Sequence, residues 1–332
     1  MGCSRRPIAL PIRGSGGQAR PAMKSPILLR RILTGLAGLT VLLALVTLAL
    51  WIYFTPAHTR QDGVQYGTRN GTPLTLDILR PRNPNGLGVA FMVSGGWKSA
   101  GPGQTPSWMC APVLRRGYTV FAITHVSQPR SSVQEIFEDV QRGVRFVRHN
   151  AAAYGIDPDR LGVIGGSAGG HLSLLLATRG GPGPAEAPDP IDRASSAVQA
   201  VAIFYPVTDL IDLGSSTENL QDGGPPKSFT KAFGPTVTNL VAWTNIGRAL
   251  SPLYHVHASQ PPVLIHHGTA DTLTPPEQSE RFQKASQALG RTVEIVYHEG
   301  GKHGWLTLPL DVRHLAAWFD VHLLAQPSPN TR

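Results

Sequence analysis

The pentapeptide Gly-Gly-Ser-Ala-Gly at residues 165–169 constrains the fold of this chain more than any other feature. It follows the apolar run 161–164, which predicts a buried strand, and it precedes a helix-forming stretch at 171–178. A serine between small residues at a sharp strand-to-helix turn is held exposed, where a neighbouring base can activate its hydroxyl. The sequence therefore predicts a nucleophile elbow with Ser167 as the nucleophile.

An acid and a histidine follow in the order that such a nucleophile requires. Asp271 comes after the apolar run 263–267, and His303 lies among glycines before the last predicted helix. In a catalytic triad the carboxylate fixes the imidazole and the imidazole takes the serine proton. A helix-capping role for Asp271 and a solvated loop position for His303 are the alternatives. A reserve acid and a reserve base also lie at predicted strand ends: Asp209 and His298.

Stabilising a tetrahedral oxyanion needs preorganised N–H donors, which this chain offers at two places. One is Ala168, the residue after the nucleophile, and the others are Gly95 and Gly96 in the loop after the predicted strand 89–93. A plain strand-to-helix turn is the alternative for the glycine loop. Three aromatic residues near these motifs are substrate-pocket candidates, with core or lid packing as the alternative: Trp97, Phe204 and Trp305.

Predicted strands and helices alternate along the chain. A hairpin is predicted at 63–80 with Asn70-Gly71 as its turn. The other predicted strands are 89–93, 119–123, 161–164, 198–205, 263–267 and 293–297, and the predicted helices are 133–153, 171–178, 276–289 and 309–324. This alternation predicts an α/β domain with a mostly parallel, twisted sheet and helices on both faces. Ligands bind such sheets at the carboxyl ends of the strands, where every motif above falls. The long stretch 208–251 is predicted to be a lid insertion, with a surface loop as the alternative.

Residues 32–54 form an uncharged apolar run that is long enough to cross a hydrocarbon core about 30 Å thick. The residues before it include seven basic side chains and no acid: Arg5, Arg6, Arg13, Arg20, Lys24, Arg30 and Arg31. The positive-inside rule therefore places residues 1–31 in the cytoplasm as a basic tail, and residues 55–326 outside it as the catalytic domain. Secretion after cleavage near residue 57 is the alternative.

Composition supports this partition. The chain has a net charge of +9, but the basic tail supplies most of it, so the remaining domain is nearly neutral. We therefore expect a tail that faces anionic lipid, and no nucleic-acid partner. The two cysteines, Cys3 and Cys110, would lie on opposite sides of the bilayer, which leaves no intramolecular disulfide and suggests no cysteine-based metal site.

Taken together, five stretches resemble the α/β hydrolases of the carboxylesterase type, close to their hormone-sensitive-lipase-like and carbohydrate-esterase-like branches. They span residues 154–160, 165–172, 204–210, 261–271 and 301–304. The resemblance implies that Ser167, Asp271 and His303 form the triad. It also implies that the oxyanion receives hydrogen bonds from three backbone groups: Gly95, Gly96 and Ala168.

One stretch departs from that family. The family usually shows His-Gly-Gly-Gly-Trp where this chain has Val93-Ser94-Gly95-Gly96-Trp97. Backbone donors survive this change, but the hydrogen bonds that hold the loop must differ.

The resulting hypothesis is a membrane-anchored serine esterase that cleaves small acyl or sugar esters through an acyl-enzyme, with no metal and no organic cofactor. Its partners would be a small-molecule ester and, through residues 32–54, the membrane. A serine peptidase of the prolyl-oligopeptidase type and an inactive, membrane-tethered binding module are the alternatives.

Overall fold

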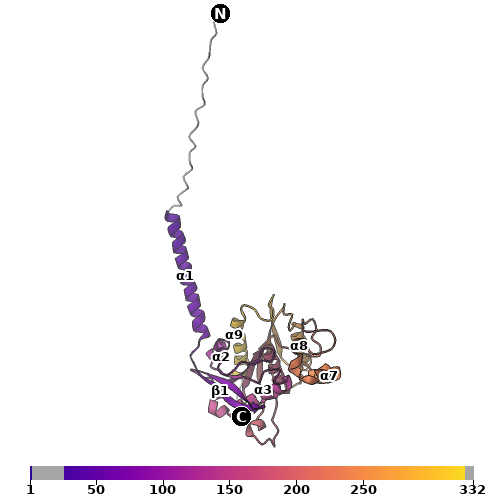
Figure 1. Cartoon of the computed structure of the whole chain (residues 1–332). Helices are drawn as coiled ribbons and strands as arrows, with labels where there is room; N and C mark the ends of the chain where they lie inside the picture. The colour runs from indigo at the N-terminus through magenta and orange to yellow at the C-terminus, as the bar shows by residue number, and fades with distance from the viewer. Residues whose placement is uncertain (2–25, 326–332) are drawn as a thin grey trace. The chain divides into compact units, whose positions relative to one another are not determined.

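The computed structural model describes Met1 and residues 26–325 of the chain (Figure 1). It divides into two units, with the boundary between Trp51 and Ile52. Helix α1 (Pro26–Phe54) includes residues 30–54, which are long and apolar enough to cross a membrane by length and composition. The predicted basic tail lies almost wholly outside the described residues.

The second unit is built on one eight-stranded sheet with the strand order β1-β2-β4-β3-β5-β6-β7-β8. Strand β2 pairs antiparallel with β1 and with β4, and all other neighbours are parallel. The bounds of the strands are β1 (His58–Arg69), β2 (Thr72–Pro81), β3 (Gly88–Met92), β4 (Thr119–Ile123), β5 (Leu161–Gly166), β6 (Ala200–Phe204), β7 (Val263–Gly268) and β8 (Val293–His298). The predicted, mostly parallel sheet is confirmed.

Helices cover both faces of this sheet, as the sequence predicts. Helices α2 and α9 pack against one face and lie side by side, whereas α3, α5 and α8 pack against the other (Figure 1). The helical bounds are α2 (Ser107–Arg115), α3 (Val133–His149), α4 (Ala151–Tyr154), α5 (Ala168–Arg179), α6 (Pro190–Arg193), α7 (Leu240–Ala249), α8 (Glu277–Gln287) and α9 (Leu308–Phe319). Shorter turns are η1 (Thr230–Phe233), η2 (Pro235–Thr238), η3 (Pro252–His255) and the π-helical turn η4 (Asp320–Leu324).

Helix α3 shows how local sequence sets these boundaries. It begins with a capping box in which the Ser132 hydroxyl accepts from the Glu135 N–H and the Glu135 carboxylate accepts from the Ser132 N–H. It ends at His149, earlier than predicted, because the Asn150 side chain donates to the Phe146 carbonyl oxygen at 2.8 Å and α4 then starts anew. Its apolar stripe is fully buried: Ile136, Val140, Val144 and Val147.

Residues 208–229 of the stretch 208–251 form no helix or strand, whereas its second half folds into η1, η2 and α7. It has its own anchor, because the buried Trp243 ring packs edge-on against Phe233 with the ring centroids 5.0 Å apart. The Asn239 side chain caps α7 by accepting from two backbone N–H groups. Leu240 and Val241 on the same helix are exposed.

Candidate active site

Ser167 lies at a strained turn between β5 and α5. Its backbone has φ 54° and ψ −121°, a conformation that non-glycine residues rarely adopt. Residues in such strained conformations cluster at functional sites. The turn needs glycine on both sides, since a Cβ at Gly165 would lie 2.4 Å from the Gly169 carbonyl oxygen and one at Gly169 would lie 2.5 Å from the Met92 carbonyl oxygen. The predicted elbow geometry is therefore present, with the hydroxyl at the N-terminus of α5.

A continuous chain of hydrogen bonds links the three predicted triad residues. His303 Nε2 lies 2.9 Å from Ser167 Oγ, and His303 Nδ1 lies 2.8 Å from Asp271 Oδ2. A carboxylate only accepts, so Nδ1 carries the hydrogen and Nε2 is left as the acceptor for the serine proton. The structure thus brings together the three residues for which the sequence predicts the roles of nucleophile, base and acid.

The Asp271 carboxylate is buried yet fully hydrogen-bonded. Its Oδ1 accepts from the N–H groups of Leu273 and Thr274, and its Oδ2 accepts from His303 and from the Thr274 hydroxyl at 3.0 Å. Burial alone would raise the pKa of Asp271, but the hydrogen bonds and charge of His303 and the bonds from Thr274 hold the pKa below its ordinary value. Asp271 is therefore ionised at neutral pH. Thr274 is a functional neighbour of Asp271 for which the sequence gives no individual signal.

The oxyanion loop, residues 94–99, differs from the sequence prediction at one donor. The Gly95 N–H donates to the Lys98 carbonyl oxygen at 2.9 Å, and the Lys98 N–H returns a bond to the Gly95 carbonyl oxygen at 3.0 Å. The Gly95 N–H is therefore already hydrogen-bonded within the loop. The N–H groups of Gly96 and Ala168 have no hydrogen-bond acceptor among the described residues.

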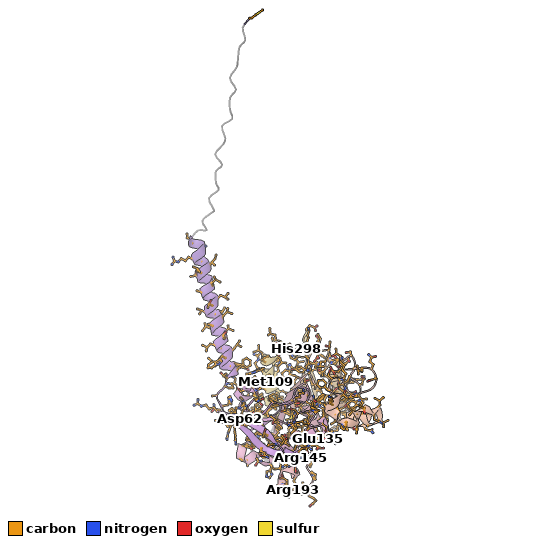
Figure 2. All side chains as sticks on the ribbon, in the orientation of Figure 1. Asp62, Met109, Glu135, Arg145, Arg193 and His298 are labelled. Atoms are coloured by element: carbon orange, nitrogen blue, oxygen red, sulfur yellow. The ribbon has the colours of Figure 1, made fainter. Side chains whose placement is uncertain are left out.

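A cavity of about 500 Å³ opens over Ser167 and His303. Its walls are mostly apolar, and Glu218 is the one carboxylate among its lining residues in the described part of the chain. Met109 of α2 lines the cavity. Figure 2 shows Met109 and His298, the last residue of β8, on the side of the domain opposite Arg193. The stretch 208–251 contributes five lining residues, for which the sequence gives no individual signal: Leu213, Ser216, Glu218, Pro226 and Phe229.

The three aromatic pocket candidates separate in the structure. Trp97 lines the cavity, with its indole N–H donating to His171 Nδ1 at 3.2 Å. Phe204 and Trp305 do not line it. Their ring centroids lie 5.9 Å apart, because Phe204, the last residue of β6, is buried in the layer of α9 and the half-buried Trp305 packs against that layer. Tyr205, for which the sequence gives no individual signal, also lines the cavity, and its ring centroid lies 4.4 Å from that of His303.

The reserve residues have other partners. Asp209 is buried and forms an ion pair with Arg281 at 3.0 Å. His298 lies 2.8 Å from His266 and stacks on Trp305, with no contact to Ser167. Among the described residues, no group of three or more His, Cys, Asp or Glu side chains is arranged to hold a metal ion.

This fold and this arrangement of side chains define an α/β hydrolase of the carboxylesterase type. The BD-FAE family model matches residues 76–285, and the chain belongs to that family.

Known proteins share both sequence and fold with it. Esterase LipQ of Mycobacterium tuberculosis is 32% identical over 203 residues, which cover 61% of this chain and 46% of LipQ. The chain spans about half the length of the curated relatives it matches. Butyrate-bound esterase 2 of Thermogutta terrifontis is 28% identical with a TM-score of 0.62, covering 80% of this chain and 96% of that one. A truncated carbohydrate esterase from gut microbiota shares the fold, at 22% identity and a TM-score of 0.67 over 81% of this chain and 99% of that one.

Proposed function

We propose that this protein is a serine esterase that hydrolyses carboxylic esters through an acyl-enzyme. The observation that carries the proposal is the hydrogen-bonded chain from Asp271 through His303 to Ser167 beneath an apolar cavity. The esterases to which the chain is similar support the same reaction class.

In the acylation step the Ser167 hydroxyl oxygen attacks the ester carbonyl carbon, while His303 Nε2 takes the hydroxyl proton. The negative charge that develops on the carbonyl oxygen is stabilised by the N–H groups of Gly96 and Ala168. When the tetrahedral intermediate collapses, the bond to the alcohol oxygen breaks and His303 returns the proton to that oxygen. Asp271 holds the imidazole in the required tautomer and stabilises its positive charge.

Deacylation repeats these steps with water. His303 takes a proton from a water molecule, the hydroxide attacks the acyl carbon, and the proton is then delivered to the Ser167 oxygen as the acid leaves. The products are a carboxylic acid and an alcohol.

The proposed substrates are esters of small acyl groups or of sugars. A mostly apolar cavity of about 500 Å³ suits a short or medium acyl chain. The relative from Thermogutta terrifontis binds butyrate, and the gut esterase acts on carbohydrate esters by name.

The proposed location is a single-pass membrane protein anchored by residues 32–54, with residues 1–31 as a cytoplasmic basic tail and residues 55–326 outside the cytoplasm. An apolar helix near the N-terminus supports an anchor, and a signal sequence passes the same test. The basic residues before the helix support the orientation. The lid role of 208–251 is part of the same proposal, because that stretch contributes to the walls of the cavity.

A burst experiment tests the function on the full chain in detergent micelles. We expect p-nitrophenyl butyrate to give a burst of nitrophenol equal to the enzyme concentration, and a fluorophosphonate probe to label the protein. Both signals should vanish in Ser167→Ala. Esterase 2 of Thermogutta terrifontis is phosphonylated by sarin, a related reaction. No turnover and no labelling of the folded wild-type protein would instead support the inactive binding module, and cleavage of a prolyl peptide faster than the ester would support the peptidase.

A further inference from the structure

We propose that His125 is a positioning residue that fixes the oxyanion loop through Ser94, an inference that rests on the proposed esterase function. His125 lies two residues beyond the end of β4 and is buried, with 8% of its surface exposed. Its Nε2 lies 3.0 Å from Ser94 Oγ. Neither side chain belongs to the hydrogen-bonded triad.

The direction of this hydrogen bond follows from the other ring nitrogen. His125 Nδ1 lies 3.1 Å from the Val126 carbonyl oxygen, which can only accept. Nδ1 therefore carries the hydrogen, Nε2 is an acceptor, and the Ser94 hydroxyl donates to it. Burial lowers the pKa of His125 to about 4, so this neutral tautomer is the form present at neutral pH.

Ser94 is also held from its other side. Its carbonyl oxygen accepts from the Gly169 N–H at 3.0 Å, which ties the oxyanion loop to the first turn of α5. Ala168, the other proposed oxyanion donor, is the first residue of that helix. The bond from Ser94 to His125 thus fixes the loop that carries Gly96 relative to the helix that carries Ala168, and the two donors must converge on one oxygen atom.

The same segment binds the loop at three further points. The Gln128 N–H donates to the Trp97 carbonyl oxygen at 3.0 Å, and the Gln128 side chain donates to the Gly96 carbonyl oxygen at 3.3 Å. The Ser99 N–H donates to the Ser127 hydroxyl at 3.0 Å. Residues 125–128 therefore form a continuous support for the loop, in which Gln128 contacts Gly96 itself and His125 contacts Ser94, two residues before Gly96.

This arrangement accounts for the departure of the loop from the sequence pattern of related esterases. The loop has Val93 and Ser94 where those esterases usually have histidine and glycine. Here the imidazole comes from the segment that follows the neighbouring strand β4, and the serine hydroxyl supplies the group that it binds. Replacing Ser94 by the glycine of the family pattern would remove the bond.

The test compares steady-state kinetics of the full chain with p-nitrophenyl butyrate for wild type, Ser94→Ala, His125→Leu, His125→Gln and the double variant Ser94→Ala/His125→Leu. Gln places an acceptor oxygen near the position of Nε2, and Leu has none. Thr124→Val is the matched control. It removes a buried hydroxyl that donates to the Thr75 carbonyl oxygen at 2.6 Å, beside His125 but without contact to the oxyanion loop.

We expect Ser94→Ala and His125→Leu each to lower kcat about 30-fold with KM changed less than about 2-fold, a smaller loss than the 10²- to 10³-fold that follows removal of a whole donor. The double variant should lose no more than either single one, because both remove the same bond. His125→Gln should recover most of the rate, and Thr124→Val should keep it.

Three results would overturn the inference while leaving the esterase function intact. They are a wild-type kcat in Ser94→Ala, equal losses in His125→Leu and His125→Gln, and additive losses in the double variant. Ser94→Ala removes a single oxygen atom and gives the answer if the His125 variants do not fold. A folded wild type that is as inactive as Ser167→Ala would overturn the proposed function, and this inference with it.

Discussion

The imidazole of His303 lies 2.9 Å from the hydroxyl of Ser167, although the two residues are 136 positions apart in the sequence. Both residues lie at the same edge of the sheet, because the serine follows β5 and the histidine follows β8. Asp271 follows β7, which lies next to β8 in the strand order, and it fixes the ring from the other side. The catalytic predictions below depend on this convergence.

Replacing Asp271 by Asn should lower kcat about 10⁴-fold with little change in KM, because an amide can donate to Nδ1 and favour the wrong imidazole tautomer. Steady-state kinetics with p-nitrophenyl butyrate measure this loss. Asp209→Asn is the matched control, because Asp209 is equally buried but pairs with Arg281. A larger loss of kcat in Asp209→Asn than in Asp271→Asn would show that Asp209, and not Asp271, is the catalytic acid.

Gly165→Ala should destabilise the domain by about 2 kcal/mol, because the added Cβ would lie 2.4 Å from the Gly169 carbonyl oxygen, which belongs to a backbone that cannot move freely. Urea unfolding of the two proteins gives the difference. At the adjacent Gly166 the nearest atom to an added Cβ is 3.6 Å away, so Gly166→Ala should unfold close to the wild-type midpoint. Equal midpoints for both variants would show that the elbow tolerates bulk at Gly165.

The sequence predicts the strand-end residues well for a physical reason. Parallel strands end at one edge of the sheet, so the loops that follow those ends lie near that edge, as the loops that carry Asp271 after β7 and His303 after β8 do. The hairpin is equally local, because Asn70 and Gly71 both take positive φ values of 49° and 76°, as the predicted two-residue turn requires. Helix α2 is not predicted, because Pro112 lies within it.

Side-chain direction and the free backbone donors are not readable from the sequence. Phe204 turns into the core, whereas its neighbour Tyr205 takes φ 32° and faces His303, and no glycine marks that conformation. Gly95 and Gly96 look alike in sequence, but only Gly95 closes the turn with Lys98. The direction of Tyr205 depends on a contact with a distant segment, and the state of the two glycines depends on how the turn from Gly95 to Lys98 closes.

The free energy of unfolding should decrease as the pH falls from about 6.5 to about 4, with His171 as one cause. Burial lowers the pKa of His171 from its ordinary 6.5 to about 4, so in this range the unfolded chain binds a proton that the folded chain does not. The stabilisation is complete above pH 6.5 and is lost on acidification, by about 3 kcal/mol for a shift of this size. Urea unfolding at several pH values measures it.

His171→Gln should reduce this pH dependence, because an amide can donate to the Leu250 carbonyl oxygen and accept from Trp97, as the imidazole does, without titrating. His149→Gln, at an exposed position on α3, is the control and should leave the slope at its wild-type value. An unchanged slope in His171→Gln would remove this residue as a cause. His125 and His266 are also buried with lowered pKa values, about 4 and about 3, and a residual slope is expected from them.

Glu218 should make the cavity discriminate against acyl chains that end in a carboxylate. The side chain is 9% exposed, lines the cavity, and accepts from the Ser228 N–H and hydroxyl at 2.8 and 3.0 Å. At an effective dielectric constant of about 20, two like charges about 8 Å apart repel by about 2 kcal/mol, which corresponds to about 30-fold in rate. The two substrates to compare are p-nitrophenyl hexanoate and p-nitrophenyl hydrogen adipate, which have six-carbon acyl chains and differ at the terminal group.

The ratio of kcat/KM for the two esters isolates the charge from general damage to the site. Glu218→Gln keeps the shape and removes the charge, so the preference for hexanoate should fall about 30-fold, mainly through faster hydrolysis of the adipate ester. Ser228→Ala removes one hydrogen bond to Glu218 but keeps the charge, and it should retain the wild-type preference. If both variants lower the preference equally, the position of the side chain and not its charge controls selectivity. If neither does, the acyl chain binds away from Glu218, toward the part of the cavity lined by Met109.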